Sequence, residues 1–191
     1  MIDLKDVMPI ADLDDWEMRL KRQDALWRGE ILDRPFCHIN FFELNPDFPF
    51  PQKTHATAEE FWLDTEYRAE LALALVMNTA WMGDTLPTAF PDLGPDFFAA
   101  CYGGQLRFTA STSFIVPFLK HWEDADDLRF DWRHPYFLKM EELYRAYLEI
   151  GKNRFYTGWP DLHPGGDCLV GFRGPANLAM DLIDNREAVQ A

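Results

Sequence analysis

Apolar side chains recur along much of the chain at intervals of three and four residues, the spacing that buries one face of a helix. The pattern is clearest in EELYRAYLEI and its flanks, and glycine stands at the end of that stretch. The helices it predicts cover residues 13–29, 64–81, 96–102, 136–150, a stretch that begins at 167, and 185–191. The chain is therefore expected to be rich in helix.

Short apolar runs between these helices predict strands. The candidates are FCHINFF (36–42), TLPTAF (85–90), LRFT (106–109), SFIVPFL (113–119) and RFYTGW (154–159). Strands that alternate with helices of this length are typical of βαβ units and a parallel sheet. We therefore expect one α/β domain that covers residues 1–191, with its chemistry at the carboxyl ends of the strands.

Composition narrows the class of protein. With 191 residues, 48% of them hydrophobic, the chain is long and apolar enough to form a buried core. Its formal net charge of -14 argues against a nucleic-acid partner, which requires a basic surface, and against binding to an anionic membrane. No apolar run reaches the length of a membrane span, and the first residues lack the order of a signal peptide. Three separated cysteines, interpreted as reduced thiols, complete the picture of a cytoplasmic protein.

The segment DLHPGGD, which begins at Asp161, carries the most chemistry and follows the last expected strand. His163 is a candidate general acid or base, because an imidazole titrates near neutral pH, and Asp161 is placed to orient it. Gly165 and Gly166 would let a substrate approach the amide groups that open the next helix. Asp167 is expected to cap that helix. The spacing is no diagnostic metal motif, so no metal is predicted, and a purely structural turn is the alternative.

The first expected strand carries two further polar side chains. In a regular strand, His38 and Asn40 lie on the face opposite to Ile39. On the inner face of a barrel they would contact the substrate. The alternative is a hydrogen-bonded role in the core.

Four segments of the chain resemble, in order, segments of one known family. They are AFPDLGPDFFAACYGGQLRF (89–108), SFIVPFLKHWEDADDLRF (113–130), FYTGWPDLHPGGDCLVGFRG (155–174) and NLAMDLIDNREAVQA (177–191). Through their order and spacing the chain is similar, from about Ala25 to its last residue, to the uroporphyrinogen decarboxylase superfamily. That superfamily also includes corrinoid and coenzyme M methyltransferases.

The resemblance implies a (β/α)8 barrel and a catalytic role for Asp92. Asp92 stands where the family's F-S-D-I-L segment has its catalytic aspartate, and an aspartate of a tight turn is the alternative. A full barrel takes about 250 residues, so this chain is expected to supply about the first four βα units, preceded by an N-terminal helix. It is thus interpreted as the N-terminal half of a barrel.

The resemblance also indicates a reaction. Where the decarboxylases have arginines that bind an acidic substrate, in an R-Q-A-G-R-Y loop, this chain reads CHINFFELNP without any arginine. Corrinoid-linked methyl transfer involving a small molecule is therefore favoured. Uroporphyrinogen decarboxylation and a non-catalytic binding or accessory role are the alternatives. The family's methyltransferases bind zinc through a second half that this sequence does not include, so no cofactor is assigned to the chain itself.

The same interpretation sets the expected partners. A small molecule or a corrinoid protein is the expected substrate, and this half alone is expected to be inactive. A half barrel leaves open sheet edges, which pair with other chains. Self-association into homo-oligomers is therefore expected.

Overall fold

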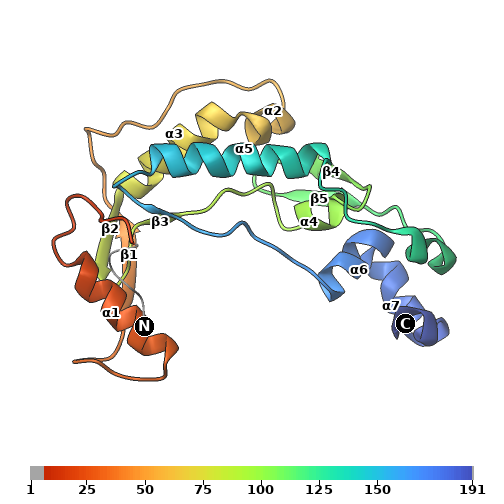
Figure 1. Ribbon diagram of the computed structural model, residues 1–191. Coiled ribbons are helices and arrows are strands. Elements are labelled where there is room, and N and C mark those ends of the chain that lie inside the picture. Colours follow the sequence, from red (N-terminus) through yellow and green to blue (C-terminus); the bar gives the residue numbers. More distant parts are fainter. Residues whose placement is uncertain (1–6, 191) are drawn as a thin grey trace. The chain divides into compact units, whose positions relative to one another are not determined.

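The computed structural model describes residues 7–190 and shows a chain of mixed helices and short strands (Figure 1). The chain forms two compact units, each made of three separate stretches. Among the described residues, unit 1 contains 7–53, 66–90 and 144–158, and unit 2 contains 54–65, 91–143 and 159–190. The mixed helix-and-strand class is confirmed. The sheets of the described residues have two strands each, and none closes into a barrel. The expectation of a single domain stays a prediction.

Unit 1 holds two small sheets and parts of three helices. Its elements are α1 (Trp16–Trp27), β1 (His38–Phe42), α3 (Thr65–Met77) after its first residue, β2 (Thr79–Gly83), β3 (Thr88–Ala89), α5 (Pro135–Ile150) from Tyr144 onward, and β6 (Tyr156–Thr157). β1 pairs with β2 antiparallel, and β3 pairs with β6 parallel. On α3 the buried residues Ala69, Ala72 and Val76 follow helical spacing, so one apolar face of this helix packs into the core.

Unit 2 is built around a hairpin and several short helices. Its elements are α2 (Ala58–Leu63), α4 (Phe97–Ala100), β4 (Gln105–Phe108), β5 (Ser113–Val116), a 3₁₀ helix (Trp122–Asp127), α5 up to Leu143, α6 (Gly166–Arg173), α7 (Pro175–Asp184) and α8 (Arg186–Gln190). Leu93 and Leu143 are fully buried. Aromatic rings extend this core in edge-on contacts, among them Tyr102 with Phe172 and with Phe130.

The helix expected over 64–81 is wrong at its end, because the chain leaves the helix after Met77 and forms β2. Asn78 explains the change. Its side-chain Nδ2 donates to the carbonyl oxygens of Ala74 and Phe48, and its Oδ1 accepts from the Asn45 amide. An asparagine that satisfies backbone groups in this way competes with further helical hydrogen bonds. The apolar run after it therefore becomes a strand.

The expected parallel arrangement holds for one strand pair and is wrong for the other two. β4 and β5 are joined by the short turn 109–112, in which the Thr109 amide donates to the Thr112 carbonyl, and a connection this short permits only antiparallel pairing. The strand expected over 85–90 shrinks to β3. Pro87 has no amide hydrogen to donate, and the Thr85 hydroxyl instead accepts from the Ile39 amide.

A buried ion-pair network ties together the N-terminal part of unit 1. The carboxylate of Asp84 is fully shielded from solvent and accepts two hydrogen bonds from Arg34, at 2.7 and 2.8 Å. Arg22 donates to it at 3.1 Å, and the backbone amide of Cys37 donates at 2.9 Å. These four groups are called the Asp84 network below. Every oxygen lone pair that burial removes from water thus finds a donor, as buried charges require.

β1 leaves apolar side chains exposed on both of its faces. Ile39, Phe41 and Phe42 are 45%, 50% and 64% exposed, and Met82 on the paired strand is 49% exposed. Apolar surface of this kind on a two-stranded sheet favours contact with another chain. The expected self-association stays a prediction that this surface supports.

Candidate functional site

The candidate segments follow the two parallel strands. Because β3 and β6 are parallel, the chain leaves both of them in the same direction. Asp92 comes shortly after β3, and Asp161 and His163 come shortly after β6, before α6 begins. Both segments thus extend from the carboxyl ends of parallel strands, the position expected for the chemistry of an α/β protein.

His163 lies between two carboxylates. Its Nε2 is 2.8 Å from Asp161 Oδ1, and its Nδ1 is 3.3 Å from Asp167 Oδ2. The side chains are 37%, 47% and 65% exposed for His163, Asp161 and Asp167, so solvent and small molecules reach all three. The contact with Asp161 is a hydrogen bond, and the contact with Asp167 is an ion pair when the ring is protonated. The arrangement, called the His163 loop below, is suited to accept and release a proton.

The buried thiol of Cys168 holds the backbone of this loop. Its Sγ donates to the carbonyl oxygen of His163 at 3.2 Å. Burial raises the pKa of Cys168, and the nearby carboxylates of Asp167 and Asp96 raise it further. The sulfur therefore stays protonated as a donor and is a poor nucleophile.

The structure corrects the role of Asp167, which does not cap α6. The helix begins at Gly166, Gly165 is its N-cap residue, and no side chain caps it. Gly165 has a φ of 66°, in the left-handed region that glycine adopts without strain. A Cβ added at either glycine would meet no atom within 4 Å, so the space around the start of the helix is open. Asp167 lies within the first turn, where it pairs with His163.

Asp92 takes part in a tight turn. Its Oδ1 accepts a hydrogen bond from the Gly94 amide at 2.6 Å, the pattern of an Asx turn. Gly94 has a φ of 91°, and a Cβ there would lie 2.0 Å from Ser113 Oγ, so the turn requires glycine. The hydrogen bond from Gly94 agrees with the interpretation of Asp92 as a turn residue, and it engages one of the two carboxylate oxygens. A catalytic role for Asp92 stays a prediction.

His38 and Asn40 are exposed on β1, opposite Gly83 and Trp81 of β2. The alternative that they are buried core residues is therefore wrong. They belong to unit 1, whereas the other candidate residues belong to unit 2. Their role in substrate binding stays a prediction.

The arginines that flank the candidate segments are engaged within the protein. Arg34 binds Asp84 through both terminal nitrogens. The Nε of Arg173 donates to Asp181 at 2.5 Å, and its Nη1 donates to the Lys120 carbonyl. The ion pair with Arg173, opposed by burial, lowers the pKa of Asp181. Both guanidinium groups are thus paired with carboxylates of the protein itself.

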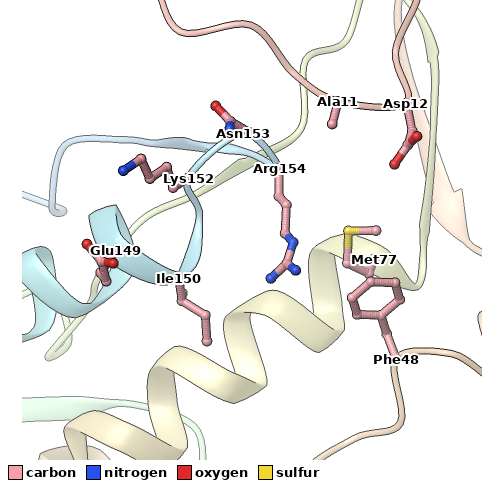
Figure 2. Close-up of a pocket in the computed structure, with 9 residues that line it drawn as sticks. All are labelled: Ala11, Asp12, Phe48, Met77, Glu149, Ile150, Lys152, Asn153 and Arg154. Atoms are coloured by element: carbon pink, nitrogen blue, oxygen red, sulfur yellow. The ribbon is translucent and has the colours of Figure 1, made fainter.

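A pocket in unit 1 was not anticipated from the sequence. It has a volume of about 550 Å³ and is lined by residues 11–12, Phe48, Met77, 149–150 and 152–154 (Figure 2). The sequence did carry one signal. Lys152 and Arg154 place two positive charges directly after α5, in a chain whose 32 acidic residues outnumber 18 basic ones.

Among residues 7–190, no three His, Cys, Asp or Glu side chains converge in a way that would hold a metal ion. In the same part of the chain, no helix has both the length and the apolar character needed to cross a membrane.

No family model, no curated protein and no solved structure matches the chain. The functional assignment below therefore rests on the residues and their geometry.

Proposed function

We propose that the chain is the N-terminal half of a barrel enzyme like those of the uroporphyrinogen decarboxylase superfamily, and that it takes part in methyl transfer between a corrinoid and a small molecule. The observation that carries the proposal is His163 held between Asp161 and Asp167 on the segment after β6. The connection from β3 to the parallel strand β6 contains α4, the β4–β5 hairpin, the 3₁₀ helix and α5. A helix between two parallel strands, which α5 supplies here, is one feature of such barrels. In this proposal β3 and β6 are two strands of the barrel.

The proposed methyl transfer includes one proton transfer. A small thiol that accepts the methyl group must first lose its proton, and His163 is placed to take it. A methylated corrinoid, if bound here, would supply the methyl group to the thiolate sulfur and keep the electron pair of the broken bond. His163 would hold the proton that the thiol gives up. Asp161 would stabilise the imidazolium through a charge-assisted hydrogen bond, and the nearby carboxylate of Asp167 would stabilise it through its charge.

Uroporphyrinogen decarboxylation has less support. Its substrate bears many carboxylates and calls for several guanidinium groups beside the His163 loop. Arg34 and Arg173 already bind Asp84 and Asp181. A non-catalytic binding or accessory role is the second candidate, because Asp92 takes part in a turn.

A binding experiment tests the proposal, since half a barrel is expected to be inactive by itself. Methylcobalamin is titrated into the full chain and into His163→Asn, with tryptophan fluorescence as the readout. Wild type is expected to bind, and His163→Asn to bind about tenfold more weakly or worse, because the variant loses an imidazole that, in this proposal, hydrogen-bonds to the bound corrinoid.

His121→Asn is the matched control, because His121 is also exposed and lies in the same unit. It should bind like wild type. If wild type does not bind methylcobalamin, or binds uroporphyrinogen more tightly, methyl transfer is excluded. Equal affinity in wild type and His163→Asn would remove His163 from the site.

A further inference from the structure

The pocket of unit 1 contains a cation, the guanidinium of Arg154, that pairs with no carboxylate of the described residues. Among residues 7–190, no ion pair engages the guanidinium of Arg154. Its contact is with an aromatic ring, since its Cζ lies 5.9 Å from the centroid of Phe48. Figure 2 shows the side chain of Arg154 reaching from its loop toward the space between Ile150 and Met77. The cation is thus displayed toward the pocket while its hydrogen-bond donors stay available.

The turn that carries Arg154 is held in place by the N-terminal segment of unit 1. The Ala11 amide donates to the carbonyl of Asn153 at 2.8 Å, and the Asn153 amide donates to Met8 Sδ at 3.1 Å. Asp12 and Asn153 both have a φ of 61°. Asp and Asn adopt this left-handed conformation more readily than other residues with side chains. These contacts fix the rim of the pocket before any ligand arrives.

The pocket offers an apolar wall beside this cation. Phe48, Met77 and Ile150 line it and are partly exposed. Its volume of about 550 Å³ falls within the range of about 300–1,000 Å³ typical of small-molecule sites. Besides Arg154, the lining includes Asp12, Glu149 and Lys152, and a combination of apolar side chains with a few charged groups is usual for such a site.

We propose that this pocket binds a small carboxylate with an aromatic or similarly apolar body. The carboxylate pairs with the guanidinium of Arg154, whose planar fork matches its two oxygens. The body packs against Phe48 and Met77. The site is independent of the His163 loop and of the methyl-transfer proposal.

Other charged groups around the pocket do not reverse this preference. Asp12 and Glu149 also line it, but neither forms an ion pair with Arg154 among the described residues. Coulomb energy falls with distance, and salt screens exposed charges, so the cation in direct contact with the ligand dominates. The ammonium group of Lys152 points away from Arg154 and adds no competing site in the pocket (Figure 2).

Calorimetric titration of the full chain tests the proposal with three probes. These are 3-phenylpropionate, 3-phenylpropylamine, which has a similar body and the opposite charge, and propionate, which has the charge without the ring. 3-Phenylpropionate is expected to bind at least about tenfold more tightly than either comparator. Arg154→Met, which keeps the length of the side chain and removes its charge, should lose about tenfold or more in affinity. Arg154→Lys should retain part of it.

Arg107→Met is the matched control, because Arg107 is an exposed arginine on β4 of unit 2. It should bind 3-phenylpropionate like wild type. The proposal is overturned if the amine binds as tightly as the carboxylate, or if Arg154→Met binds as tightly as wild type. If Arg154→Met does not fold, Arg154→Lys and Phe48→Leu decide instead. Unchanged affinity for 3-phenylpropionate in both would equally overturn it.

Discussion

Both the Asp84 network of unit 1 and the His163 loop of unit 2 join carboxylates to nitrogen groups, chiefly guanidinium groups in the first and an imidazole in the second. The two differ in how far solvent reaches them. The carboxylate of Asp84 has no exposure to solvent, and one of its four hydrogen bonds comes from a backbone amide. In the His163 loop the side chains of His163, Asp161 and Asp167 are each more than one third exposed, and they contact one another side chain to side chain.

This difference separates charges that hold a conformation from charges that are available for chemistry. In a buried carboxylate, hydrogen-bond donors of the protein compensate for the loss of water. The surrounding structure therefore depends on those donors. Exposed ion pairs contribute little to stability because water replaces either partner. They remain within reach of a substrate. We infer that the Asp84 network is structural and that the His163 loop is functional.

The largest expected effect is that of Asp84→Ala. Removing the carboxylate leaves the Cys37 amide and two guanidinium groups without their acceptor. Loss of one partner of a buried ion pair costs about 3–5 kcal/mol. The lower end applies, because the Arg34 side chain is 40% exposed and Arg22 keeps Asp33 as a partner. Denaturant unfolding should show a loss of about 3 kcal/mol. Asp161→Ala is the control, and a similar loss in both variants would erase the distinction.

The pH dependence of stability sharpens the same contrast. Burial by itself raises the pKa of Asp84, but hydrogen bonds from the Cys37 amide, Arg34 and Arg22 outweigh it, and the pKa lies below the ordinary value of 3.8. A lowered pKa in the folded state stabilises the protein above the pKa of the unfolded state, and this stability is lost as the pH falls through the folded pKa.

The free energy of unfolding of wild type should therefore decrease more steeply than that of Asp84→Asn below about pH 4. Denaturant titrations of both proteins at a series of acidic pH values measure this difference. A difference that does not change with pH would show that the ionised form of Asp84 is not preferentially stabilised by the fold.

Smaller effects are expected at Asp167. Since it does not cap α6, Asp167→Ala should cost no more than about 0.5 kcal/mol, as for an exposed ion pair. Thr57 is the matched comparison, because its hydroxyl accepts from the Glu60 amide at 3.1 Å and caps α2. Thr57→Ala should cost about 1 kcal/mol. Thermal unfolding of both variants checks the order, and a larger loss at Asp167 would restore its role as a cap.

Local patterns in the sequence predicted local structure. The amphipathic pattern over 136–150 became α5, and the two apolar runs on either side of residues 109–112 became β4 and β5. The proximity of His163 to Asp161 and Asp167 could also be expected, because a short loop keeps these side chains close.

The remaining features depend on contacts between residues far apart in the sequence. Arg34 and Asp84 are 50 residues apart in the sequence, and no pattern in the residues next to either one indicates that the two form an ion pair. The end of α3 depends on Asn78, whose partners include the distant Phe48 carbonyl. The pocket around Arg154 forms because the segment at Ala11 binds the turn after α5. Periodicity does not report such contacts.

The most direct test of the central claim measures stability and ligand binding on one variant, His163→Asn. The variant and wild type are compared by thermal unfolding and by titration with methylcobalamin, alongside Asp84→Ala. The account predicts that His163→Asn unfolds at the same temperature as wild type and loses about tenfold or more in affinity. The opposite result, a melting temperature as low as that of Asp84→Ala with unchanged affinity for methylcobalamin, would show that the His163 loop is structural.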